Sequence, residues 1–179
     1  MSAIGDLLTS HFRWRGDRTD DRWSADVTGW WHDPTTLAAL GPALAGLFSV
    51  SPTVVLGPQS RGMLLGALTA MHLGVGLVEL RKEPRQACDS DTWRRRTTPP
   101  DYRDRHLVLG FRQDLVSVTD RVLFVDDWID TGGQAVAARA LVADAGATWI
   151  GAAVVVDALK NPQLRRELGV RSLVHVRDL

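Results

Sequence analysis

The residues "RVLFVDDWIDTGGQA" (121–135) join an apolar strand to a helix through a charged turn. The apolar run ends in two adjacent carboxylates, Asp126 and Asp127, and a third acid, Asp130, precedes Thr131-Gly132-Gly133. Glycines at a helix start let backbone N–H groups approach an anion, which the helix N-terminus also attracts. The turn therefore predicts a phosphate site. The acids beside it are expected to bind hydroxyls or a metal attached to that phosphate.

Helical and strand-like segments alternate from about residue 34 onward. Asp33 followed by Pro34 is typical of a helix start. The apolar patterns predict helices over 35–48, 62–73 and 134–145, strands over 53–56, 75–80, 106–111, 122–125 and 150–156, and a short helix and strand in the tail. This alternation predicts an α/β fold with a mostly parallel sheet flanked by helices, whose ligands bind at the carboxyl ends of the strands.

The segment 82–104 is different in character. It is polar, contains prolines and shows neither the helical nor the strand pattern of apolar residues, so it is predicted to be a loop. A loop of this length in a compact domain is more often functional or mobile than idle. Its run Arg94-Arg95-Arg96 is interpreted either as a solvated charge cluster or as a contributor to anion binding.

Composition excludes several classes of protein. The chain has 179 residues, enough for a single domain, with 45% hydrophobic residues, 23% charged residues and zero net charge, so no general attraction to nucleic acid or membrane is expected. One cysteine, Cys88, rules out a disulfide framework and favours the cytoplasm. No signal-like or membrane-spanning apolar run is expected, and five scattered histidines argue against a zinc site.

Other readings of the turn over 121–135 fit less well. A Walker loop needs Gly-Lys-Ser/Thr, which is absent, and Gly74-Val75-Gly76 lacks the third glycine of a dinucleotide fingerprint. The letters DDWID also match the DDxxD signature of isoprenoid synthases, but that signature lies within a helix and here a strand precedes it. An ordinary acidic strand-to-helix turn remains the simplest structural alternative.

The segment "VLFVDDWIDTGG" resembles the 5-phosphoribosyl 1-diphosphate (PRPP) motif of type I phosphoribosyltransferases. "GPQSRGMLLG" (57–66) resembles the pyrophosphate loop of the adenine subfamily, and "VTGWWHDP" (27–34) and "ELRKEP" (79–84) resemble flanking segments in the same order. The likeness extends over about residues 20–160. It implies a single domain over 1–179, with an N-terminal hood over 1–32 and a mobile loop over 82–104.

The resemblance implies a role for each part of the motifs. Asp126 and Asp127 would hold the ribose hydroxyls and, directly or through water, magnesium. The 5′-phosphate loop would comprise Asp130, Thr131, Gly132, Gly133, Gln134 and Ala135, although adenine enzymes end it with a hydroxyl residue where Gln134 stands. The pyrophosphate site would comprise Ser60, Arg61, Gly62, Arg81 and Lys82, with a cis peptide expected at Gln59–Ser60.

The acceptor base is less clearly indicated. Adenine enzymes usually carry alanine where Asp130 stands, whereas hypoxanthine-guanine enzymes carry an aspartate that contacts the purine. Asp101-Tyr102 resembles the Glu-Tyr pair of adenine enzymes. Taken together, the resemblances imply that the catalytic residues are Asp130, Asp101 and Arg61. Trp23 is the candidate for stacking on the base, and Trp30 and Trp31 are weaker candidates because tryptophans more often belong to the core.

The resemblance thus implies a magnesium-dependent, homodimeric transferase. It would move 5-phosphoribose from PRPP to a purine base and release pyrophosphate. Two alternatives remain open: a regulatory protein of the same fold that senses PRPP without catalysis, and a transferase for an oxopurine or another acceptor.

Overall fold

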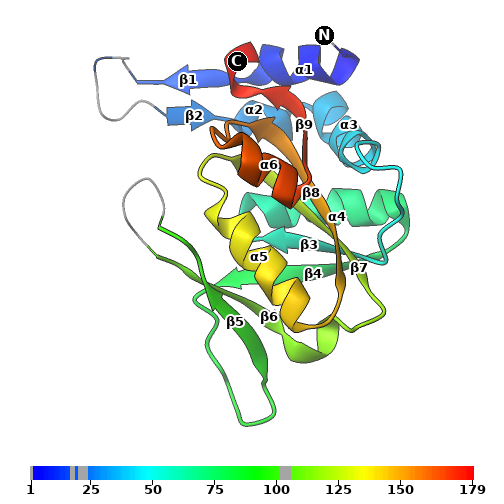
Figure 1. Cartoon of the computed structure of the whole chain (residues 1–179). Helices are drawn as coiled ribbons and strands as arrows, with labels where there is room; N and C mark the ends of the chain where they lie inside the picture. The colour runs from blue at the N-terminus through cyan, green and yellow to red at the C-terminus, as the bar shows by residue number, and fades with distance from the viewer. Residues whose placement is uncertain (1, 17–18, 20–23, 101–105) are drawn as a thin grey trace.

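The computed structural model describes residues 2–16, 19, 24–100 and 106–179, which form a sheet between two layers of helices (Figure 1). The helices are α1 (Ala3–His11), α2 (Thr28–His32), α3 (Pro34–Ala45), α4 (Arg61–Leu73), α5 (Gly133–Asp144) and α6 (Pro162–Leu168). The strands are β1 (Arg13–Arg15), β2 (Ser24–Asp26), β3 (Val54–Pro58), β4 (Gly76–Lys82), β5 (Trp93–Thr97), β6 (Val108–Arg112), β7 (Arg121–Ile129), β8 (Thr148–Asp157) and β9 (Val170–His175). Short 3-10 helices cover Gln113–Leu115 and Val176–Asp178.

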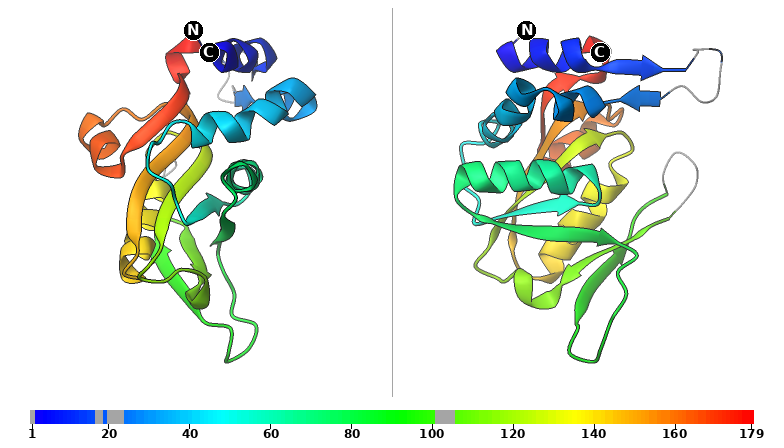
Figure 2. Two further views of the ribbon diagram at one scale, coloured as in Figure 1. Left: turned by 90° about the vertical axis from the view of Figure 1, so that its right-hand side faces the viewer. Right: turned by 180° about the vertical axis from the view of Figure 1, so that it is seen from behind.

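The main sheet has seven strands in the order β5-β6-β4-β3-β7-β8-β9 (Figure 2). Strands β4, β3, β7, β8 and β9 run parallel to one another, while β6 pairs antiparallel with both β4 and β5. The prediction of a mostly parallel sheet is therefore confirmed. The central position of β3 and β7 places the loops that follow them at the same edge of the sheet.

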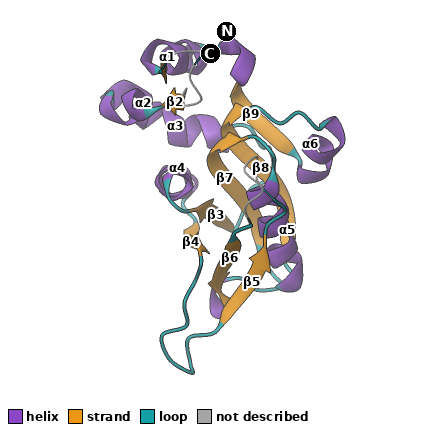
Figure 3. Ribbon diagram, turned by 90° about the vertical axis from the view of Figure 1, so that its left-hand side faces the viewer, coloured by secondary structure: helices purple, strands orange, loops and turns teal. Residues whose placement is uncertain are grey.

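Strand β7 is apolar along its length because helices cover both of its faces. Leu123 and Val125 pack into the cluster formed with α1 to α4, whereas Val122 and Phe124 pack into the cluster formed with α5. Figure 3 shows α4 and α5 on opposite sides of the sheet. Successive side chains of a strand alternate between faces, so burial of both faces produces an unbroken apolar run.

Local signals set the ends of the helices as predicted. The Asp33 carboxylate accepts a hydrogen bond from the Thr36 N–H at 2.7 Å, which caps the start of α3. Gly74 ends α4 in the left-handed conformation, with φ of 68°. Among the described residues, no helix has the length and apolar character needed to cross a membrane.

The segment 82–104 differs from the prediction, because its residues Trp93–Thr97 form strand β5 rather than loop. This strand pairs along its length with β6 at the edge of the sheet. Its side chains are half-buried or exposed on both faces, so the sequence lacks the alternation by which a strand is recognised.

The N-terminal segment forms a small layer that packs on α3 and β9 (Figure 1). Trp30 is fully buried there, and its Nε1 donates a hydrogen bond to the Leu8 carbonyl at 2.9 Å. Phe12 is also buried, and its ring lies 6.4 Å from that of Trp128 on β7. Trp30 is therefore a core residue, and it does not stack on a ligand.

We expect Trp30→Ala to lower the free energy of unfolding by about 3–5 kcal/mol, because it leaves a cavity and an unpaired carbonyl. Trp31→Ala is the matched control, since Trp31 is only partly buried and should cost clearly less. Denaturant unfolding of both variants measures the difference. Equal losses would contradict the placement of Trp30 in the core.

Candidate active site

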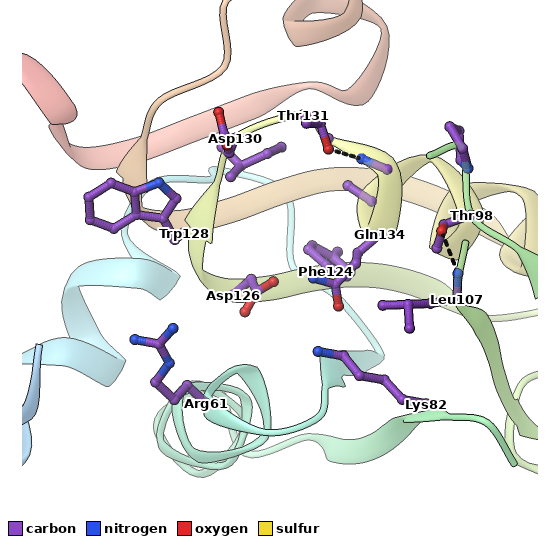
Figure 4. A pocket seen from close by; sticks show the side chains of 15 residues that line it. Arg61, Lys82, Thr98, Leu107, Phe124, Asp126, Trp128, Asp130, Thr131 and Gln134 are labelled. Carbon is purple, nitrogen blue, oxygen red and sulfur yellow. Dashed lines mark hydrogen bonds between the residues drawn. The ribbon is translucent and has the colours of Figure 1, made fainter. Parts of the chain in front are cut away.

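A cavity of about 460 Å³ opens beside the carboxyl ends of β4 and β7, at the N-termini of α4 and α5 (Figure 4). Parallel strands bring these ends to one edge of a sheet, which is where ligands bind in open α/β folds. The lining includes every residue from Trp128 to Ala135, together with Arg61, Lys82 and Asp126. Most of the residues assigned to phosphate and ribose from the sequence therefore lie around one space.

The acid pair lies close to the carboxyl end of β7, which continues to Ile129. Asp126 and Asp127 are nearly buried, with exposed fractions of 7% and 6%. Neighbouring strand residues face opposite sides of the sheet, so Asp126 lines the cavity while Asp127 points toward α4. The Asp126 Oδ1 accepts a hydrogen bond from the Asp127 N–H at 2.9 Å.

The surroundings of Asp126 disfavour its charged form. Burial raises its pKa well above the ordinary value, and the negative charge of Asp127 raises it further. The nearby positive charge of Lys82 opposes these effects without cancelling them. A cation or a set of hydroxyl donors placed in the cavity would reverse this balance and favour the carboxylate.

Asp127 is paired incompletely. Its Oδ2 lies 3.0 Å from Nη1 of Arg61, within ion-pair range. The same oxygen is buried yet receives no well-directed hydrogen bond from any described residue. Arg61 itself is about half exposed, with 48% of its side chain accessible. A buried carboxylate oxygen with spare capacity is suited to a ligand hydroxyl or a metal ion.

The loop assigned to the 5′-phosphate from the sequence, residues 130–135, lies between β7 and α5, and we refer to it as the phosphate loop. Gly132 precedes the helix with φ of 80°, a conformation that side chains of L-residues rarely adopt. The Gly133 N–H donates to Thr131 Oγ1 at 3.4 Å, and the N–H groups of the next residues belong to the first turn of α5. First-turn N–H groups have no partner within the helix, so this end of α5 is suited to an anion.

The loop after β3 approaches the acids closely. The peptide bond Gln59–Ser60 is cis, as predicted. A Cβ atom on Gly62 would lie 2.8 Å from Asp126 Oδ1 and 2.5 Å from Cδ of Pro58. Only glycine fits there, and its absence of a side chain lets the start of α4 lie against the acid pair.

The two basic residues at the end of β4 have different surroundings. Lys82 lines the cavity, and its N–H donates to the Gln59 Oε1 at 3.0 Å. Arg81 does not line the cavity; its Nε lies 3.7 Å from Glu79 Oε2, and its guanidinium lies over the Trp93 ring. The structure therefore brings Lys82, but not Arg81, to the other site residues.

Several cavity residues were not predicted. Trp128 forms part of the wall and is half-buried, with its ring edge-on to that of Trp14 at 6.2 Å (Figure 4). Its position inside the acidic motif was the signal that could have identified it. Thr98 and Pro99, beyond β5, also line the cavity. Gln134, which was assigned to the 5′-phosphate loop from the sequence, also lines the cavity, and its Oε1 is buried without a hydrogen-bond partner among the described residues.

Asp130 is exposed at the rim of the cavity. It also borders a smaller hollow of about 270 Å³, to which Lys160 contributes. Ser60 lies at the start of α4 and lines an open depression with Lys82. Trp23 and Asp101, the other candidates for base binding and catalysis, lie outside the described residues.

The sequence matches the family model of the phosphoribosyl transferase domain over residues 43–173. The chain belongs to the phosphoribosyltransferase family. The match includes the loop after β3, the acid pair and the phosphate loop, so the family's PRPP motif and the cavity described above coincide. As a member of this family, the protein is an enzyme of the transferase class.

Relatives extend the likeness to nearly the whole chain. The chain is 35% identical over 158 residues to the adenine phosphoribosyltransferase of Methylococcus capsulatus, covering 84% of this chain and 86% of that protein. It is 34% identical over 162 residues to that of Frankia casuarinae, covering 87% and 81%. The crystal structure of adenine phosphoribosyltransferase from Rhodothermus marinus superposes with a TM-score of 0.81 at 28% identity, covering 97% of this chain and 98% of that one.

We expect Gly132→Ala to lower the free energy of unfolding by about 1–2 kcal/mol and to weaken PRPP binding, because the added Cβ strains the phosphate loop. Gly74→Ala is the matched control, since Gly74 has a similar φ of 68° but open space around it, away from the cavity. Denaturant unfolding and calorimetric PRPP binding test both variants. An equal loss of PRPP affinity in the two would contradict the role of this loop.

We expect Asp126→Asn to stabilise the ligand-free protein at neutral pH. The unfolded carboxyl has a pKa near 3.8, while burial keeps the folded pKa well above that value. The unfolded state therefore loses its proton first, and wild-type stability falls as pH rises from about 4 toward the folded pKa. Melting temperatures measured from pH 4 to 8 should show the variant gaining over wild type as pH rises, and a constant difference would contradict this.

Proposed function

We propose that the protein transfers 5-phosphoribose from PRPP to a purine base, with adenine the favoured acceptor, and releases pyrophosphate. The observation that carries the proposal is the buried acid pair of β7, which lies between two helix N-termini suited to phosphate groups. The adenine phosphoribosyltransferases of Methylococcus capsulatus and Frankia casuarinae, similar over most of this chain, support the choice of acceptor.

The roles in the proposal follow from the positions of the side chains. The loop from Asp130 to Ala135 binds the 5′-phosphate, and Asp126 and Asp127 hold the ribose hydroxyls. Ser60, Arg61, Gly62 and Lys82 bind the pyrophosphate, whereas Arg81, which contacts Glu79 and Trp93 instead, is given no role in it. Displacement at C1 of the ribose generates oxocarbenium-like positive charge, which the carboxylates stabilise, while the basic groups stabilise the leaving pyrophosphate.

Magnesium is the cofactor that fits these residues. Asp127 Oδ2, which accepts no hydrogen bond from a described residue, and the surroundings of Asp126, which disfavour its charged form, both suit a divalent cation. No group of three or more His, Cys, Asp or Glu in the described part of the chain forms a metal cage. Magnesium is commonly held by one or two carboxylates together with substrate phosphates. When bound, it neutralises charge on the pyrophosphate.

Trp128 is proposed as an aromatic wall for the base. It is the cavity-lining side chain with a flat ring next to both Asp126 and Asp130 (Figure 4). Stacking on such a ring tolerates any purine, so selection among purines depends on polar groups. Asp130 is proposed to handle the proton on the base, with Asp101 and Trp23 as further candidates for the same region.

An oxopurine acceptor is the second candidate, and one observation favours it. Asp130 and Lys160 line the same small hollow next to the cavity, so a donor and an acceptor are available for a ring N–H and an exocyclic oxygen. The family match and the transferases among the relatives argue against the remaining alternative, a PRPP-sensing regulator that would use the same phosphate and ribose contacts without catalysis.

We further propose a homodimer in the cytoplasm. The family resemblance supports the dimer, and the single cysteine supports a reducing compartment. We also propose that residues 1–179 form one domain in which the N-terminal segment 1–32 is the hood and part of 82–104 closes over bound PRPP.

The test is pyrophosphate release from PRPP with magnesium and a panel of adenine, hypoxanthine, guanine, xanthine and pyrimidines. We expect release with adenine, and a loss of about 100-fold or more in kcat/KM for Asp127→Asn, because a preorganised charge at the reacting centre is removed. Asp114→Asn, at an exposed site away from the cavity, is the control and should keep full activity.

Each outcome decides between the candidates. Preferred release with hypoxanthine or guanine would select the oxopurine acceptor. PRPP binding without release for any base would select the sensor. Full activity of Asp127→Asn would refute the ribose assignment.

A further inference from the structure

Two arginines of β5 make a polar contact with the last residue of α5. Arg96 Nε and Nη2 donate to the Oδ2 and Oδ1 of Asp144 at 2.7 and 2.6 Å, which is a bidentate ion pair. Arg94 Nη1 donates to the Asp144 carbonyl at 3.0 Å. We call these three hydrogen bonds the β5–α5 clamp. The partners lie about fifty residues apart in the sequence, so the clamp is a tertiary contact.

The clamp involves one face of strand β5. Arg94 and Arg96 are two residues apart on a strand, so both side chains face α5, whereas Arg95 between them faces the other side. The Arg96 hydrogen bonds hold the pKa of Asp144 below its ordinary value, which keeps this carboxylate charged near neutral pH. Arg–carboxylate pairs with two parallel hydrogen bonds are the geometrically specific kind.

The strand leads directly from the clamp to the cavity. Thr98, two residues beyond Arg96, is buried with 5% exposure and lines the cavity with Pro99. The Thr98 N–H donates to the Leu107 carbonyl at 2.8 Å, and the Leu107 N–H donates to Thr98 Oγ1 at 3.1 Å. These two hydrogen bonds tie Thr98 to the residue preceding β6.

The cavity wall formed by Thr98 and Pro99 lies against the phosphate loop. A Cβ atom on Gly133 would be 3.2 Å from the Pro99 carbonyl and 3.8 Å from the Thr98 Cβ. Helix α5 therefore begins beneath this wall and ends at Asp144, where the clamp holds β5. The same helix therefore carries the phosphate loop at its start and, through the clamp at its end, holds the strand that leads to Thr98 and Pro99.

We propose that Arg96 and Asp144 are positioning residues for PRPP, which hold Thr98 and Pro99 at the distance from the phosphate loop that the bound 5′-phosphate requires. The inference rests on the proposed function. Neither residue lines the cavity, so both act through β5 and α5. Exposed ion pairs contribute little to global stability, and the effect is expected in substrate affinity rather than in folding.

The test compares Arg96→Gln, Asp144→Asn and the double variant in steady-state kinetics. Each single variant should raise the KM for PRPP about fivefold, with kcat within about twofold of wild type and little change in melting temperature. The double variant should be no worse than either single variant, because both remove the same contact. Arg95→Gln, on the opposite face of the strand, is the matched control and should leave KM unchanged.

An unchanged KM in both single variants, or additive effects in the double variant, would overturn the inference. A rise in KM for Arg95→Gln equal to that for Arg96→Gln would also overturn it, since general loss of charge would then explain the effect. Absence of pyrophosphate release by the wild type would instead refute the proposed function. In that case calorimetric PRPP binding by the same variants tests the clamp, and equal affinities would refute it.

Discussion

Two neighbouring carboxylates, nearly buried close to the carboxyl end of β7, are the constraint on which the rest of the structure depends. Burial raises the pKa of Asp126, and Asp127 Oδ2, although within ion-pair range of Arg61, accepts no well-directed hydrogen bond from any partner in the part of the chain that the structure describes. Buried charge without such partners is costly, so this arrangement works against the stability of the ligand-free protein. The arrangement is explained as preorganisation for a ligand that brings hydroxyls and a cation. Functional sites commonly lose stability in this way in exchange for activity.

The surrounding elements follow from that constraint. A parallel sheet places the ends of β3, β4 and β7 at one edge, so two helix N-termini, one lysine and one arginine meet the acids there. Glycines at 62 and 132 permit the close approach and the left-handed turn that these loops need. Helix α5 connects two proposed sites, because it begins at the loop proposed to bind the 5′-phosphate and ends at the contact with β5.

The sequence predicted the starts and ends of α3, α4 and α5 within a few residues, because caps and apolar spacing are local signals. The alternation of helices and strands predicted the parallel sheet, and with it the clustering of the motif residues at one edge. The cis bond at Gln59–Ser60 was implied by the family resemblance. The sequence did not predict β5, whose polar edge position removes the alternation that marks a strand. It also treated Arg81 and Lys82 alike, since the face that each residue of a strand presents depends on register within the sheet. Trp128 was missed because an apolar residue inside a motif gives no indication whether it faces core or cavity.

The most direct measurement is a crystal structure of the protein grown with magnesium and PRPP. The account predicts the 5′-phosphate at the start of α5, the ribose hydroxyls on Asp126 and Asp127, and the pyrophosphate between Arg61 and Lys82. Density for PRPP elsewhere, or with its ribose away from the acid pair, would contradict the central claim.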